Sequence, residues 1–232
     1  MNRKRYQPFY KQVLQVRKNI QNRVKLFRLK KQKWVRFQNY AQKQLKFFKR
    51  FKVKDQYQLS VAKFRSRGNS FRKKFKNDLL SRKTLKLFYG ELRQSYLNCL
   101  IEKVRPLKNP EKVLFYILEH RIDVILYRAN FASSIKHARQ MILHGHIKVN
   151  GKKMTICSYV VKPGSYITAS KNLAVRAVIR KQIDMSNFWP LPPKHLVVNY
   201  KTLQVIPIAH NDQIENFQPV FNHYLNIDTI IT

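Results

Sequence analysis

The sequence predicts an α+β protein with a basic helical N-terminal part, a helix-helix-small-sheet unit and an extended C-terminal segment. Three observations indicate this fold. Basic residues dominate the first 90 positions, apolar residues recur at helical spacing from Leu85 to Ile142, and an alternating stretch surrounds Asn150-Gly151. With 44% apolar residues in 232, the chain is long and apolar enough to bury a core.

The N-terminal region is the most basic part of the chain. Residues 1–90 contain 29 Lys and Arg residues against Asp55 and Asp78, a balance of +27. Between residues 1 and 55, basic and aromatic residues interleave with few helix breakers. Two interpretations stay open for this part: helices that fold against a polyanion, or a disordered extension that orders only when it binds one.

Two helices are expected ahead of the sheet-forming region. The first carries one apolar face from Leu85 to Leu100 and ends before Pro106. Asn109-Pro110-Glu111 then supplies an N-cap, a proline at the first helical position and an acid in the first turn. This combination predicts the start of a second helix there.

Two shorter helices follow. Ile122, Ile125 and Leu126 share the spacing of one helical face, and Ser133 or Ser134 is positioned to cap the next helix. Gly145 is expected to end that helix, because glycine adopts the positive φ that a helix terminus requires.

A small sheet is expected next. Ile147 and Val149 alternate with polar residues, and Asn150-Gly151 is the strongest short signal for a two-residue hairpin. The returning strand should therefore occupy Lys152–Ile156. The remaining expected features are a turn at Pro163-Gly164 and a third strand over Tyr166–Thr168.

The charge of the whole chain indicates a polyanionic partner. There are 48 Lys and Arg residues and 11 Asp and Glu residues, for a formal net charge of +37. A phosphate backbone relieves the resulting self-repulsion, and the counterions that it releases favour binding, so nucleic acid is the expected partner. A membrane surface is disfavoured because the charge extends over about ninety residues, and no run of 18 or more apolar residues occurs.

The cysteines and the first residues suggest a compartment. Cys99 and Cys157 have no metal-ligand spacing and fit a reducing environment, where they are expected to be core thiols. Residues 1–6 have no apolar signal core, and the following stretch is unlike a Ser-rich transit peptide. Import from the cytosol is therefore not expected.

The region from Arg121 onward carries a specific resemblance. Arg121–Ser134, Ala138-Arg139-Gln140, His144–Ile147, Val149–Lys152 and Val161–Gly164 follow one another in order and spacing. Together they resemble the RNA-binding module of the ribosomal protein S4 family in its ribosomal branch. Two flanking stretches, Lys83–Gln94 and Leu191–Leu203, are similar to the helix before this module and the segment after it in organellar members.

The resemblance covers about residues 80–205 and implies a division of the chain. The expected parts are a basic extension over 1–75, a helical part of the body over 76–109, the RNA-binding module over 110–172, and a C-terminal segment over 173–232 that packs on the body or a neighbour. Residues 1–75 depart from the bacterial pattern and lack the zinc-binding cysteines of some members.

Candidate RNA contacts follow from the basic and polar residues of this module and of the loop before it. The helix pair is expected to project its arginines and lysines away from its apolar faces as a cationic platform, and the hairpin to reach phosphates and sugars. The candidates are Arg65, Arg67, Arg72, Lys73, Lys74, Arg121, Arg128, Ser133, Lys136, Arg139, Gln140, His144, His146, Lys148, Asn150, Lys152 and Lys153.

Ordinary structural roles also explain these residues when each is considered by itself. A solvated face is as good an explanation as a phosphate contact for any single lysine or arginine, and Ser133 is a helix cap first. Tyr127, Phe131 and Tyr159 are interpreted as core or brace residues rather than base-stacking platforms. The three histidines His137, His144 and His146 have no carboxylate or cysteine at ligand spacing. No metal, cofactor, catalytic residue or small-molecule substrate is expected.

The resemblance implies an architectural function: binding small-subunit ribosomal RNA near a helix junction of its 5′ domain, early in assembly, beside neighbouring small-subunit proteins. Two alternatives use the same module, namely an RNA-modifying or aminoacylating enzyme and a stalled-ribosome rescue factor. Residues 1–110 contain only four acids and no Gly-rich phosphate loop, which disfavours an enzyme. A composition rich in Lys, Asn, Ile, Phe and Tyr favours a mitochondrial ribosome, with a plastid as the alternative.

Overall fold

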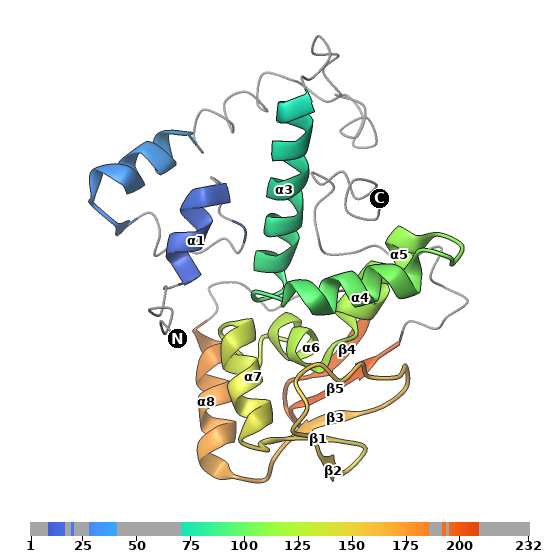
Figure 1. Cartoon of the computed structure of the whole chain (residues 1–232). Coiled ribbons are helices and arrows are strands. Elements are labelled where there is room, and N and C mark those ends of the chain that lie inside the picture. The colour runs from blue at the N-terminus through green and yellow to red at the C-terminus, as the bar shows by residue number, and fades with distance from the viewer. Residues whose placement is uncertain are drawn as a thin grey trace, which may run out of the picture. The chain divides into compact units, whose positions relative to one another are not determined.

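The computed structural model describes residues 9–16, 20, 28–40, 71–185, 192–193 and 195–208, and the chain divides into two compact units. The first runs to Glu91 and the second starts at Leu92, and each is described by itself (Figure 1). In these stretches no helix combines the length and apolar character that crossing a bilayer requires. Arg65, Arg67 and residues 209–232 lie outside them.

The first unit is helical where it is described. It contains α1 (Phe9–Val16), a helix over residues 32–40, and α3 (Phe71–Phe88). Val13, Trp34 and Phe37 form one small apolar cluster, in which the Trp34 and Phe37 rings meet edge to face at 5.9 Å. The polar side chain of Gln12 on α1 donates a hydrogen bond to Glu91. The expected helical basic part is thus present in these segments.

The expected single helix from Leu85 to Leu100 is wrong, because the chain breaks it into α3 and α4 (Gln94–Val104). Gly90 and Glu91 take positive φ values of 73° and 65°. The Glu91 N–H donates to the carbonyl of Lys86 at 2.7 Å, which closes the helix end in a Schellman-type turn. Apolar spacing continues across this turn, so it does not reveal the break.

The next helix, α5 (Pro110–Glu119), begins where the sequence predicts, but its cap differs from the prediction. Asn109 occupies the N-cap position with φ 58° and its side chain makes no capping hydrogen bond. Pro110 and Glu111 have the expected places in the first turn. The proline and the acid therefore mark this helix start, while Asn109 serves as a left-handed backbone position.

The two helices of the predicted module are α6 (Ile122–Arg128) and α7 (Ile135–Leu143). Of the two serines proposed as a cap, Ser134 accepts a hydrogen bond from the backbone N–H of His137 at 3.2 Å. Gly145 ends α7 as predicted, with φ 71°. The Gly145 N–H donates to the carbonyl of Ile142, and the His146 N–H reaches that of Met141.

The sheet is larger than predicted. Its antiparallel strands β1 (Ile147–Val149), β2 (Lys152–Lys153) and β3 (Ile167–Ala169) are joined by β4 (Leu196–Asn199) and β5 (Gln204–Pro207) in the order β2-β1-β3-β5-β4. The hairpin turn at Asn150-Gly151 is confirmed, with positive φ at both residues. The returning strand stops at Lys153 instead of Ile156.

The prediction of an extended C-terminal segment is only partly correct, because this region also contains a helix. Leu173–Asp184 forms helix α8, capped by Asn172, whose side chain accepts from the Ala174 N–H at 3.0 Å. β4 and β5 then complete the sheet, with β5 paired to β3 through Ile167 and Val205. Helix α8 and strands β4 and β5 therefore belong to the same folded body as the predicted module.

A hydrophobic core in this second unit lies between helices α6, α7 and α8 and one face of the sheet. Ile125 from α6, Ile142 from α7, Ile179 from α8 and Ile167 and Val205 from the sheet are all fully buried in it. Helices α6, α7 and α8 lie on the same side of the strands (Figure 1). Side chains on the opposite face of the strands, such as those of Gln204 and Ile206, are exposed.

Candidate nucleic-acid interface

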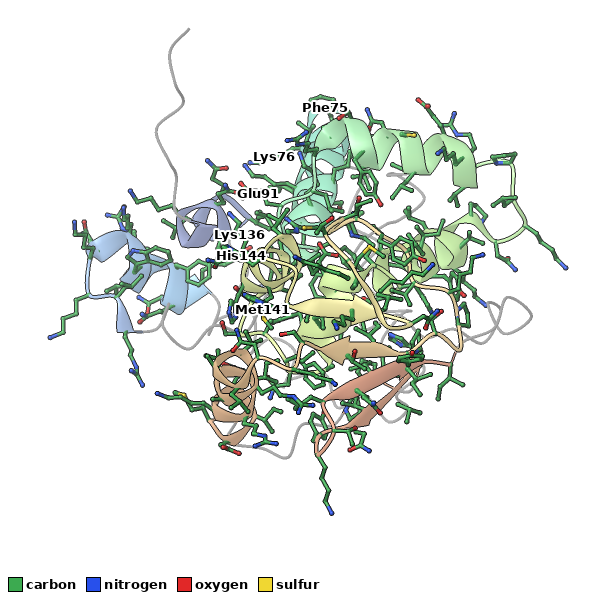
Figure 2. All side chains as sticks on the ribbon, turned by 90° about the horizontal axis from the view of Figure 1, so that it is seen from below. Phe75, Lys76, Glu91, Lys136, Met141 and His144 are labelled. Carbon is green, nitrogen blue, oxygen red and sulfur yellow. The ribbon has the colours of Figure 1, made fainter. Side chains whose placement is uncertain are left out.

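An exposed polar face follows the length of α7. Lys136, Gln140 and His144 are exposed and recur every four residues, so they share one side of this helix. Figure 2 shows Lys136 and His144 on α7 together with Met141, which is buried. Ser133, just ahead of the helix, is also exposed, and its hydroxyl lies 3.4 Å from Nδ1 of His137. These residues are therefore at the surface, where a partner can reach them.

The hairpin adds a second group of cations. Lys152 and Lys153 are exposed, and Lys148 is directly opposite Lys153 in the β1–β2 ladder. Two like charges at opposed positions repel each other, and a phosphate between them relieves this repulsion. The Lys153 side chain lies over Gly145, since a Cβ built at Gly145 would be 1.7 Å from its Cε. Glycine at this position therefore lets the hairpin approach the end of α7.

Arg121 is not part of an exposed platform, and the expectation that it projects outward is wrong. The residue is 4% exposed, and its guanidinium donates to both oxygens of Asp123, at 3.1 Å and 2.9 Å. It also lies 5.0 Å from the centre of the Tyr96 ring. Burial alone would lower the pKa of Arg121, but the hydrogen bond and negative charge of Asp123 outweigh burial and raise it.

Arg128 is likewise turned inward, which corrects the same expectation. Its Nε and Nη2 donate to the two oxygens of Glu119, each at 3.1 Å, and 11% of its side chain is exposed. Glu119 has no exposed side-chain area. A bidentate pair of this kind fixes the guanidinium rigidly, because two parallel hydrogen bonds define its plane. The pair joins the end of α5 to the end of α6.

Arg139 is in an intermediate position. Its Nε donates to Asp123 at 2.7 Å, yet 23% of its side chain reaches the surface. Asp123 is wholly buried and holds Arg121 and Arg139 at once, so one carboxylate is shared by two cations. The apolar spacing of α6 and α7 does not indicate this network, although the close Arg121-Ile122-Asp123 spacing could have suggested a local ion pair.

The loop beside the hairpin brings two histidines together. The rings of His144 and His146 stack with centroids 5.8 Å apart and an interplanar angle of 7°. Both lie at the end of α7, one on each side of Gly145. In the part of the chain that the structure describes, no group of three or more His, Cys, Asp and Glu residues could hold a metal ion.

A second pair of histidines, not singled out from the sequence, lies in the interior. His120 and His195 are 0% and 7% exposed, with ring centroids 5.8 Å apart, and His120 stacks on Tyr116 at 4.0 Å. Burial lowers the pKa of His195 to about 4, against the opposing charge of Glu119. Burial also lowers the pKa of His120. These rings are therefore neutral at physiological pH.

The remaining candidates divide according to what the structure describes. Arg72, Lys73 and Lys74 fall within α3, not in a loop, and their side chains are outside the described part, as are Arg65 and Arg67. Asn150 is exposed, but its side chain is engaged with the loop before β3. Phe131 is fully buried and Tyr159 packs against the core, as interpreted.

Known proteins resemble this chain over the same region. Residues 120–167 match the S4 domain, which spans α6, α7, the hairpin and the start of β3. The small ribosomal subunit protein uS4m of Marchantia polymorpha is 32% identical over 174 residues, covering 72% of this chain and 85% of that protein. The chain belongs to the uS4 family.

Other uS4 relatives agree on this assignment. The uS4c protein of Euglena longa is 28% identical over 184 residues, or 79% of this chain and 89% of its own length. Bacterial uS4 from Aquifex aeolicus is 41% identical over 90 residues, a smaller share of 38% of this chain and 43% of that protein. The predicted family, with organellar relatives, is thereby confirmed.

Proposed function

We propose that this uS4 protein is a structural constituent of an organellar small ribosomal subunit and binds its ribosomal RNA. The observation that carries the proposal is the exposed face of α7 with the adjoining hairpin, inside the S4 domain match. The surface presents cations and hydroxyl or amide groups to phosphates and sugars, and it lies on regular elements of secondary structure. Neighbouring small-subunit proteins are the expected further partners.

The direct contacts that we propose are the exposed and partly exposed candidates: Ser133, Lys136, Arg139, Gln140, His144, His146, Lys148, Lys152 and Lys153. Arg121 and Arg128 act indirectly, because their buried pairs with Asp123 and Glu119 fix α6 between α5 and α7. Arg65, Arg67, Arg72, Lys73 and Lys74 remain proposals on sequence grounds. Their charge fits a contact with the phosphate backbone.

A mitochondrial ribosome is the proposed location. The relatives include a uS4m and a uS4c protein, which are organellar types, and they do not separate the two organelles. The Lys, Asn, Ile, Phe and Tyr content favours the mitochondrion, because AT-rich organellar genomes tend to encode these residues. A divergent N-terminal part supports the same choice, since plastid members resemble bacteria more closely there.

We propose no catalytic role. The two acids in the interface region, Glu119 and Asp123, are buried and engaged by arginines, so neither is presented to a substrate as an acid or base. An RNA-modifying enzyme or an aminoacylating enzyme would need such groups in an accessible cleft. The S4-domain-containing rescue factor is the other alternative and differs in the subunit that it binds.

Filter binding of the full chain to transcribed small-subunit ribosomal RNA, at several salt concentrations, tests the proposal. The logarithm of the affinity should fall linearly with the logarithm of the salt concentration. Lys136→Ala and Lys152→Ala should each lower the affinity and reduce the slope by about 0.7–0.9. Lys103→Ala, on the exposed side of α4, serves as the matched control. A slope near zero in the unaltered chain would refute an electrostatic interface.

A further inference from the structure

The outer face of the sheet shares Lys148 and Lys153 with the RNA interface above and carries further residues that this interface does not use. Strand residues alternate, and one set lies in the core while the other faces away from α6, α7 and α8. The register connects one row of outward residues across all five strands, from hairpin to β4. This row consists of Lys153, Lys148, Thr168, Gln204 and Asn199.

A second outward row lies beside the first and is apolar. Val197 and Ile206 are direct partners in the β4–β5 ladder and are 50% and 37% exposed. Tyr166, two residues before Thr168, shares its face of β3 and is 44% exposed. An aromatic ring that remains this exposed on a regular sheet can receive a flat partner. The sequence did not indicate that Tyr166 is exposed on the sheet, because this residue follows a turn.

The backbone of Tyr166 is held firmly by the hairpin. The Asn150 N–H donates to the Tyr166 carbonyl at 2.9 Å, and the Tyr166 N–H donates to Oδ1 of Asn150 at 3.0 Å. The Asn150 side-chain amide also lies 3.4 Å from the Ser165 hydroxyl. Asn150, expected to contact RNA, therefore acts here as the brace of the aromatic residue.

The direction of the Tyr166 ring follows from a close neighbour. A Cβ built at Gly151 would lie 3.5 Å from the Tyr166 hydroxyl, an ordinary contact distance. The side chain thus extends along the sheet toward the β1–β2 turn. Lys148 is the diagonal neighbour of Tyr166 across β1 and β3, about 7–8 Å away by strand geometry and within reach of long side chains.

Charge decides which flat partner fits. The five strands contain Lys148, Lys152 and Lys153 but no Asp or Glu. A nucleotide fits both the exposed aromatic ring and the positive charge of this face. Its base stacks on the ring while its phosphate contacts a lysine. A protein covering the same face would have to desolvate these lysines or supply acids for them.

We propose that Tyr166 stacks on an unpaired base of RNA, with Lys148 at a flanking phosphate. This site rests on the proposed function and extends it, because it places single-stranded RNA on the sheet in addition to the α7 face. The stacking requires the π-face of the ring and not its hydroxyl.

Two substitutions at Tyr166 separate stacking from other roles. Tyr166→Leu keeps an apolar side chain but removes the ring, while Tyr166→Phe keeps the ring. The full chain is bound to transcribed small-subunit ribosomal RNA at fixed salt, with melting curves to confirm that both variants fold. We expect Tyr166→Leu to weaken binding by about 5- to 150-fold with an unchanged salt slope, and Tyr166→Phe to bind within about twofold of the unaltered chain. Ile206→Ala, on the same row, is the control and should leave affinity unchanged.

Other outcomes overturn the site in distinguishable ways. If the unaltered chain binds but Tyr166→Leu binds equally well, stacking is wrong and the proposed function stands. Equal losses in Tyr166→Leu and Tyr166→Phe would assign the effect to the hydroxyl instead of the ring. Loss of a neighbouring subunit protein from Tyr166→Leu particles, with RNA affinity intact, would make this face a protein contact. Absence of binding by the unaltered chain would refute the proposed function together with the site.

Discussion

At the scale of single residues, the interface depends on acids that RNA never needs to touch. Asp123 has no exposed side-chain area and accepts from Arg121 and Arg139, while Glu119 accepts from Arg128. A buried ion pair contributes little net stability when it is complete, but removing one partner leaves an uncompensated charge. The buried carboxylates therefore decide whether the helix pair keeps its shape.

Asp123→Ala is predicted to lower the free energy of unfolding by about 3–5 kcal/mol, because two arginines lose their shared counter-charge in the interior. Urea denaturation of the full chain measures this. Asp184→Ala, at the exposed end of α8, is the matched control and should change stability by less than about 0.5 kcal/mol. Equal effects at the two positions would contradict the role of Asp123.

The buried histidines predict a dependence of stability on pH. His195 has a pKa of about 4 in the folded chain and 6.5 as its ordinary value, so the unfolded chain binds the proton more tightly. The contribution of neutral His195 to the free energy of unfolding is therefore fully present above pH 6.5. It is lost as the pH falls toward 4, and the loss is at most about 3 kcal/mol. Thermal melts between pH 7.5 and about 4 should show this loss, and His195→Asn should flatten it. A melting temperature that rises on acidification would be inconsistent with burial.

At the scale of elements, the end of α7 connects the two parts of the RNA surface. Gly145 has φ 71° and its missing Cβ leaves room for Lys153, whereas Gly164 has φ 78° with nothing within 4 Å of a Cβ. Both positions favour glycine for the same conformational reason. Only at Gly145 does the vacant space also determine where a basic side chain lies.

The two glycines make a matched pair of variants. Gly145→Ala and Gly164→Ala should each cost about 1–2 kcal/mol of stability through backbone strain. Gly145→Ala should also lower RNA affinity, because the added methyl group displaces Lys153, while Gly164→Ala should not. Denaturation and filter binding measure the two effects separately. Equal affinity in both variants would show that the position of Lys153 is unimportant.

Local sequence signals predicted most of these elements. Features that depend on residues far apart in the sequence were not predicted. The proline start of α5, the Ser134 cap, the Gly145 stop and the Asn150-Gly151 hairpin depend on neighbours in sequence, and the structure has all four. β5 joins the sheet by pairing with β3, and β4 joins it by pairing with β5, and no local pattern encodes the first of these pairings. The burial of Arg121 and Arg128 was not predicted for a related reason. A basic residue next to apolar ones is expected to be exposed unless the position of its acidic partner is known.

At the scale of the whole molecule, net charge sets the balance between folding and binding. The formal net charge is +37, so the basic side chains repel one another in the folded chain and attract a phosphate backbone. Salt screens both interactions, so its effects on the free chain and on the complex have opposite signs. Twenty-nine of the 48 basic residues precede residue 91, which makes the first unit the main source of this charge.

Raising salt from about 0.05 M to 0.3 M should therefore increase the melting temperature of the free chain while weakening its binding to RNA. Calorimetry of the free chain and filter binding of the complex, in the same buffers, measure the two changes. Neutral sucrose at matched osmolality provides the control for effects other than screening. A free chain destabilised by salt would show that self-repulsion is not its main electrostatic cost.

Subunit sedimentation tests the central claim most directly. Detergent-solubilised mitochondria are run through a sucrose gradient at about 0.3 M salt, where weak polycation binding is screened, with magnesium lowered to separate the subunits. The chain is then followed by mass spectrometry across the gradient. The uS4 assignment predicts co-migration with small-subunit ribosomal RNA. Migration with the large subunit would support the rescue factor instead, and a chain that stays at the top of the gradient would contradict a ribosomal role altogether.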